Sequence, residues 1–281
     1  TAKSGEAQKK EGNFDQAIDA FMRALKLARE IDNKQKEVDC LMNLGLMYWN
    51  IGQIEQSSEK YNQALALAQK INLSDREQEC RNCLEIYRLY KDAKKFRDTN
   101  EYQKSVDSFQ KAIDLCRRIG SKEHEVKCLR QLSLVYWELN DIKELYSLSE
   151  EGLKIAKGLN HRKEQGRCLN NIGLFHWKLN NYSKAINCFS NAIYFAQKEK
   201  DIDNEAICLN NIGSIFLEMG SCEKAEDYLL RAVSINKNLG HNPGILANLN
   251  NLGVMYQRKG KISREENYFY KALEYFHECL K

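Results

Sequence analysis

The sequence lacks the features of a membrane-bound, secreted or nucleic-acid-binding protein. No apolar run approaches the ~20 residues that a membrane-spanning helix needs, and no signal peptide opens the chain, which starts at Thr1 without a methionine. The 43 basic and 39 acidic residues nearly cancel, and a net charge of +4 is too small to indicate a nucleic-acid or membrane surface. We therefore expect a cytoplasmic chain, with neither nucleic acid nor membrane as a partner, that is a piece of a longer protein.

Motifs for catalysis are also missing. The sequence holds no G-x-S-x-G, no H-E-x-x-H and no glycine-rich phosphate loop. Its histidines show no metal-ligand spacing; they are His124, His161, His176, His241 and His277. We expect a protein that is not an enzyme and that needs no cofactor or metal.

The chain has one proline, and no segment alternates apolar and polar residues as a half-buried strand would. Leu, Ala, Glu, Lys, Asn and Gln dominate, which predicts an all-α fold. Within this helical composition a motif recurs: Cys168-Leu-Asn-Asn-Ile-Gly173 returns at Cys208–Gly213 and, with asparagine first, at Asn248–Gly253. Weaker copies begin at Cys40, Cys80 and Cys128, so the steps are 40, 48, 40, 40 and 40 residues.

A second ladder of small residues keeps the same period. Its members are Ala24, Ala64, Ala112, Gly152, Ala192, Ala232 and Ala272. Three places before them stand bulky residues, with Ser149 as the exception: Phe21, Tyr61, Phe109, Phe189, Leu229 and Phe269. Two ladders that share one period and one eight-residue slip indicate repeats.

Each repeat is interpreted as a helix A, a tight turn, a helix B and a connection. Turn residues fall between the two ladders, for example at Asn180-Asn181 and Gly260-Lys261. Gly173 and Ala192 allow the two helices to approach closely, and Phe189 fills the space beside them. Because no repeat can bury its apolar stripe alone, we expect neighbouring repeats to stack.

These residues resemble the tetratricopeptide repeat family. Leu44-Gly45, Tyr48, Tyr61 and Ala64 fit its pattern of a Leu-Gly pair followed by spaced aromatic and alanine residues. The period of 40 instead of 34 is similar to that of kinesin light chain and Pins-type repeats. The resemblance implies an all-α, right-handed α-solenoid of about seven helix pairs. We expect one domain over 1–281, with units at about 1–33, 34–73, 74–121, 122–161, 162–201, 202–241 and 242–281.

In this family helix A lines a concave groove, where asparagine near the Leu-Gly pair binds a peptide backbone. Here a second stripe of amide and apolar side chains follows each helix A, and an amide can both donate and accept a hydrogen bond. The candidate partner-binding residues are Asn43, Leu46, Trp49, Gln131, Leu134, Trp137, Asn170, Asn171, Leu174, Trp177, Asn210, Asn211, Asn250 and Asn251. In the alternative interpretation the asparagines bond across the seam between repeats and the tryptophans pack against the next hairpin.

Two further features leave alternatives open. The cysteines at the repeat period are interpreted as small buried residues, too far apart for disulfides. The eight-residue insertion after Cys80 lengthens helix A or its turn, and it is either a solvated projection or a second docking site through Lys91, Lys94, Lys95 and Arg97.

The sequence therefore predicts an interaction scaffold that binds a protein or peptide. The alternative is a sensory or regulatory module of a larger signalling, protease-linked or ATPase-linked protein. The oligomeric state is left open.

Overall fold

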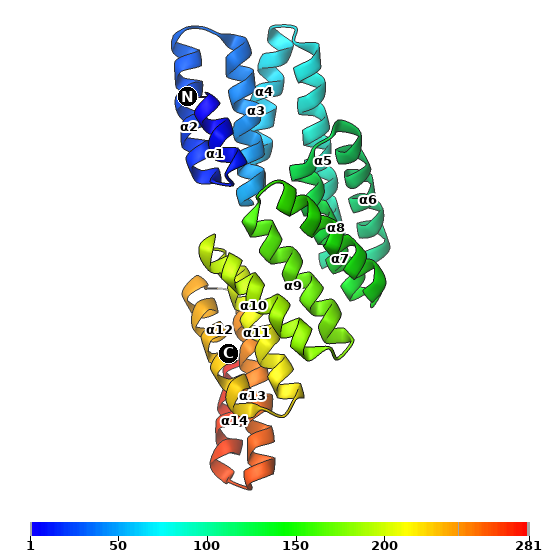
Figure 1. Cartoon of the computed structure of the whole chain (residues 1–281), viewed down its shortest axis with the longest axis vertical. Coiled ribbons are helices and arrows are strands. Elements are labelled where there is room, and N and C mark those ends of the chain that lie inside the picture. The colour runs from blue at the N-terminus through cyan, green and yellow to red at the C-terminus, as the bar shows by residue number, and fades with distance from the viewer. Residues whose placement is uncertain (1, 241, 280–281) are drawn as a thin grey trace. The chain divides into compact units, whose positions relative to one another are not determined.

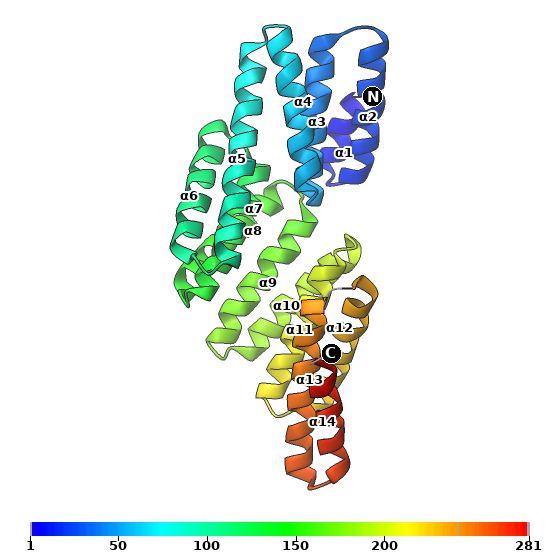
Figure 2. The same cartoon turned by 180° about the vertical axis from the view of Figure 1, so that it is seen from behind.

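The computed structural model describes residues 2–240 and 242–279, and this part of the chain consists of α-helices and short turns without strands (Figures 1 and 2). The all-α solenoid expected from the repeats is confirmed. The chain divides into two compact units, Thr1–Glu164 and Gln165–Lys281, which are described separately.

Seven antiparallel helix pairs follow one another, with odd-numbered A helices and even-numbered B helices. Unit 1 contains α1 (Ala2–Lys10), α2 (Phe14–Glu30), α3 (Lys34–Ile51), α4 (Ile54–Lys70), α5 (Ser74–Asp98), α6 (Tyr102–Ile119), α7 (Lys122–Glu138) and α8 (Ile142–Gly158). The boundary between the units falls within α9 (Arg162–Lys178). Unit 2 continues with α10 (Tyr182–Lys198), α11 (Ile202–Glu218), α12 (Cys222–Leu239), α13 (Asn242–Ser263) and α14 (Glu266–Cys279).

Almost every helix ends at a residue in the left-handed conformation. These residues are Gly12, Asp32, Gly52, Asn72, Asn100, Gly120, Asn140, Asn160, Asn180, Lys200, Gly220, Gly240 and Arg264. Glycine and asparagine dominate because they tolerate a positive φ better than other residues, and a left-handed residue stops a helix. The spacing is 20 residues, half the repeat period, except after Asn72 and after Gly240.

The contact between small and bulky residues joins the two helices of a pair. A Cβ atom added to Gly173 would lie 2.6 Å from Cε1 of Phe189, and one added to Gly45 would lie 2.9 Å from the Tyr61 ring. Phe189 and Ala192 are fully buried. The glycines are therefore required because the aromatic ring of helix B rests directly on the backbone of helix A.

The eight-residue insertion lies within α5, which has 25 residues where α3 has 18 (long cyan helix in Figure 2). The inserted segment is held by aromatic contacts: Tyr90 meets Trp49 at 5.0 Å and Phe109 at 5.8 Å between ring centroids. Ala93 stands 16 residues before Phe109, the same separation as Gly45 and Tyr61, so the close contact is rebuilt after the insertion.

The last helix pair departs from the expected register. The predicted turn at Gly260-Lys261 is wrong, because α13 continues to Ser263 and the chain turns at Arg264. Phe276, and not Phe269, packs on Gly253, with 2.5 Å from an added Cβ to its ring. Phe269 instead rests on Gly260 and is 37% exposed.

Unit 1 also has contacts between repeats that are not neighbours in sequence. The indole N–H of Trp49 in α3 donates to the carbonyl of Glu123 at 3.2 Å, and Lys127 of α7 donates to the carbonyls of Trp49 and Asn50. Lys9 pairs with Glu123 at 3.1 Å. The second and fourth helix pairs are thus joined directly.

Candidate functional site

The amides expected to form a binding row bond to each other in unit 2. The Oδ1 of Asn170 on α9 accepts from Asn211 on α11 at 3.0 Å, and Asn170 donates to Asn171 at 3.2 Å. One repeat later, Asn251 on α13 donates to Asn210 on α11 at 2.9 Å. Asn170, Asn171 and Asn211 are buried. In unit 2 these amides therefore connect successive A helices across the seam; Asn250 stands apart from them and is exposed.

Unit 1 presents a different arrangement around Asn43. Asn43 and Leu46 of α3 are half-buried and line a pocket of about 580 Å³ between α1, α3 and α5, together with Asn82. Among the described residues, Asn43 has no side-chain hydrogen bond, whereas Asn82 accepts one from Gln78 at 3.0 Å. The pocket thus combines an amide available for bonding with the apolar side chains of Met42 and Leu46.

The charges of this pocket are mostly acidic. Glu6, Asp39 and Glu79 line it, and Arg76 bridges the last two, at 2.9 Å to Asp39 and 2.7 Å to Glu79. Glu6 has no ion pair with the described residues, so its charge faces the pocket uncompensated. These groups favour a cationic or amide-rich ligand.

His124 closes the inner end of the pocket. Burial lowers the pKa of His124 to about 4, with a smaller opposing effect from Glu123. Its Nδ1 is 2.6 Å from the Ser121 hydroxyl, and its ring lies 4.6 Å from that of Trp49. The imidazole is therefore neutral near pH 7 and adds no positive charge.

The tryptophans expected beside the amides have different environments. Trp49 is 1% exposed and lies within the unit 1 core, which leaves no surface of its ring for a partner. Trp137 and Trp177 are half-buried, and the Trp177 indole donates to Glu218 at 2.8 Å. Leu174 is buried and Leu134 half-buried.

The basic run in α5 is partly engaged within the protein. Arg97 donates to the Oε1 of Gln131, which is itself buried, at 2.7 Å. Lys94 is half-buried, and burial lowers its pKa. Lys91 and Lys95 are exposed. Only these two of the four present a freely solvated cation.

Sequence reasoning missed a set of polar pairs between successive A helices. Arg97–Gln131, Arg130–Glu164 and Arg167–Asp201 each join residues 34 positions apart, at 2.6 to 2.7 Å. Glu164 is fully buried in its pair with Arg130, which is 6% exposed. Polar partners recurring at a separation of 34 within a 40-residue period were the available signal.

The described cysteines are free thiols, seven of them buried. Burial raises the pKa of Cys80 to about 12 and that of Cys208 further. Within residues 2–240 and 242–279 no three histidine, cysteine or acidic side chains gather as a metal site would require. No described helix combines the length and apolar character of a membrane span.

Solved structures with similar folds share little sequence with the chain. A Rap protein complexed with competence and sporulation factor matches 99% of this chain and 78% of its own, with 17% identity and a TM-score of 0.62. A signal transduction ATPase from Pyrococcus horikoshii with a tetratricopeptide repeat sensor matches 99% of this chain over 41% of its own length, with 16% identity and a TM-score of 0.57. The TPR-like repeats of a putative kinesin light chain from Podosopora anserina match 68% of this chain and 94% of their own, with 13% identity and a TM-score of 0.52.

No relative was found among the curated proteins compared with the chain. Two family models described as tetratricopeptide repeat do match, one over residues 2–70 and 164–238 and the other over 246–278. The first alone covers more than half of the sequence, and the chain therefore belongs to the tetratricopeptide repeat family.

Proposed function

We propose that the chain is a protein-interaction scaffold that holds an extended peptide on the A helices of unit 1. The observation that carries this proposal is the pocket of about 580 Å³ in which Asn43 has no hydrogen-bond partner among the described residues. In unit 2 the related amides are used between repeats, so they are not part of the proposed peptide site.

The ligand chemistry follows from the lining. Asn43 donates to and accepts from one backbone amide unit of the peptide, as a free carboxamide can. Asn82 has its amide nitrogen available for a backbone carbonyl, since its printed bond uses only its oxygen. An apolar side chain of the peptide rests on Met42 and Leu46, and a lysine or arginine pairs with Glu6.

Two of the structural neighbours support a binding role for this fold. The Rap protein was solved with competence and sporulation factor bound, and the repeats of the Pyrococcus horikoshii ATPase are described as a sensor. A module that binds a peptide also fits a regulatory role within a longer protein, because a sensor must first bind what it detects.

The test is a selection of peptides from a random display library on the whole chain, followed by titration of the best binders. We expect selected peptides to combine an apolar and a basic residue. Replacing both Asn43 and Asn82 with alanine removes about two hydrogen bonds of about 0.5–1.5 kcal/mol each, so affinity should fall by about 5- to 100-fold. Glu6→Lys should weaken basic peptides further than neutral ones.

The matched control is Asn62→Ala on α4, an exposed asparagine that bonds only to Ser58 on the same helix. This variant should bind every selected peptide as the original chain does. Peptides that bind tightly but are insensitive to Asn43, Asn82 and Glu6, in variants that melt normally, would place the binding surface elsewhere.

A further inference from the structure

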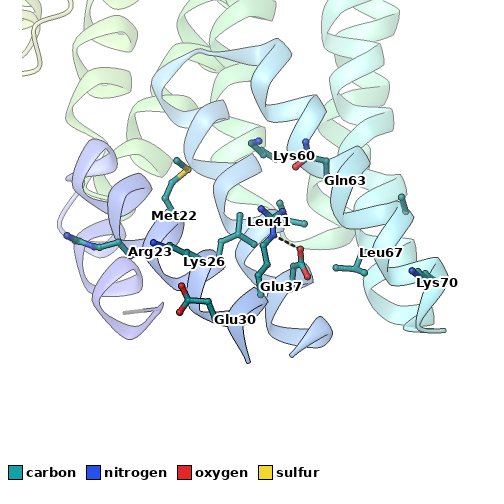
Figure 3. A pocket seen from close by; sticks show the side chains of 13 residues that line it. Met22, Arg23, Lys26, Glu30, Glu37, Leu41, Lys60, Gln63, Leu67 and Lys70 are labelled. Carbon is teal, nitrogen blue, oxygen red and sulfur yellow. Dashed lines mark hydrogen bonds and ion pairs between the residues drawn. The ribbon is translucent and has the colours of Figure 1, made fainter. Parts of the chain in front are cut away.

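A second cavity of unit 1 lies among α2, α3 and α4, apart from the Asn43 pocket. It measures about 1070 Å³, with α2 and α4 as its walls and α3 between them (Figure 3). Leu41 and Glu37 of α3 form the floor, Met22 comes from α2, and Leu67 comes from α4 (Figure 3). It shares no residue with the Asn43 pocket.

The rim of this groove carries an excess of positive charge. Its basic residues are Arg23, Lys26, Arg29, Lys60 and Lys70, against two carboxylates, Glu30 and Glu37. Glu37 is already held by Arg29 at 2.7 Å and approached by Lys34 at 3.4 Å. Arg23, Lys26 and Lys70 form no ion pair with the described residues, and Lys60 meets only Glu59 of its own helix, at 3.7 Å. The groove thus presents several cations whose charge nothing in it neutralises.

Apolar surface lies between these cations. Met22 is 49% exposed although it stands on a helix with a well-formed buried face, and Leu67 is half-buried. Exposed methionine beside leucine is typical of surfaces that accept an apolar helix face. A phosphate backbone would contact the cations but leave this apolar floor uncovered.

We propose that this α2/α4 groove docks an acidic amphipathic helix of a partner protein. The described surface offers no strand edge to which an extended chain could add, so the occupant is recognised by side chains. Its leucine-like stripe packs on Met22, Leu41 and Leu67, while glutamate or aspartate on both flanks pairs with Arg23 and Lys26 on one wall and Lys60 and Lys70 on the other.

The experiment is fluorescence anisotropy of labelled synthetic peptides of about 18 residues, or five helical turns, with the whole chain. One peptide carries a leucine stripe flanked by glutamate, the second replaces glutamate with lysine, and the third scrambles the first so that the stripe is lost. We expect the acidic amphipathic peptide to bind at least about ten-fold more tightly than either of the others. Its binding should also weaken as salt is added.

Charge reversal then locates the site. Arg23→Glu with Lys26→Glu should weaken the acidic peptide at least about ten-fold. The control pair is Lys111→Glu with Lys154→Glu, because these exposed lysines occupy the equivalent positions on the B helices α6 and α8. The control should leave binding within about two-fold of the original chain. Asn43→Ala should also leave it unchanged, which separates this proposal from the peptide site.

Four results would overturn the proposal. They are undetectable binding of the acidic amphipathic peptide, equal binding of the lysine or the scrambled peptide, equal loss in the α6/α8 control, and displacement of the peptide by a single-stranded oligonucleotide that binds as tightly. The last result would assign the groove to nucleic acid.

Discussion

At the scale of single residues, the most strongly perturbed histidine is His124. It is buried against Trp49, and the charges nearest to it are Glu123, which favours protonation, and Lys127 and Lys9, which oppose it. Burial dominates and lowers the pKa of His124 from 6.5 to about 4. The unfolded chain therefore binds a proton at this residue at a higher pH than the folded chain does.

This shift predicts that unit 1 loses stability as the pH falls. Above the unfolded pKa of 6.5 the contribution is fully present, and it is lost between there and the folded value of about 4. Between pH 7 and about pH 4.5 the free energy of unfolding should decrease by on the order of 2 kcal/mol through His124 alone. Denaturant unfolding across this range should show a flatter pH dependence in His124→Gln than in the original chain.

His277 is the matched control because it is exposed. His277→Gln should retain the pH dependence of the original chain. If His124→Gln also retained it, the titration of some other group would be responsible for the acid sensitivity.

At the scale of helix pairs, the close contact of glycine with an aromatic ring can be tested in one pair of variants. Gly173→Ala places a methyl group 2.6 Å from the buried Phe189 ring, so either the ring or the helix must shift. We expect a loss of about 1–3 kcal/mol in the free energy of unfolding. Gly158→Ala, which meets no atom within 4 Å at the end of α8, should be neutral or gain up to about 1 kcal/mol through helix propensity. Equal effects in chemical unfolding would contradict the packing of α9 on α10.

The register of the last helix pair makes a separate prediction. Gly253→Ala should be destabilising because its methyl group meets Phe276. In a Phe276→Ala background the clash disappears, so the cost of Gly253→Ala should drop by about 1 kcal/mol or more. In a Phe269→Ala background the cost should stay the same. Coupling of Gly253 to Phe269 instead would restore the register that the repeat period predicts.

At the scale of the whole molecule, each unit is more than a linear stack in one respect: unit 1 joins its second and fourth helix pairs. Lys127 is 2% exposed and donates to the Trp49 and Asn50 carbonyls at the end of α3. Lys127→Met removes these bonds, so amide hydrogen exchange should accelerate at the end of α3 as well as in α7. Lys154→Met, at an exposed site on α8, should leave α3 unchanged. Faster exchange confined to α7 and α8 in Lys127→Met would show that the two helix pairs are independent.

The repeat period alone was sufficient to predict the helix pairs. A helix needs one apolar stripe, and a pair needs a small residue where a bulky one rests, so both requirements are written at fixed spacings such as Gly45 with Tyr61. The period could not choose between Phe269 and Phe276. These residues are seven apart, or about two turns, and therefore lie on the same face of α14.

The roles of the amides and tryptophans were decided by tertiary structure. Trp49 and Trp177 have equivalent places in the repeat, yet Trp49 is buried because α7, more than 70 residues later, packs on it through His124 and Lys127. Asn43 opens into a pocket, while Asn211, with the same kind of side chain, bonds across a seam. Sequence spacing fixes which face of a helix a residue occupies, whereas its exposure depends on how far the neighbouring helices cover that face, and contacts between distant repeats set that coverage.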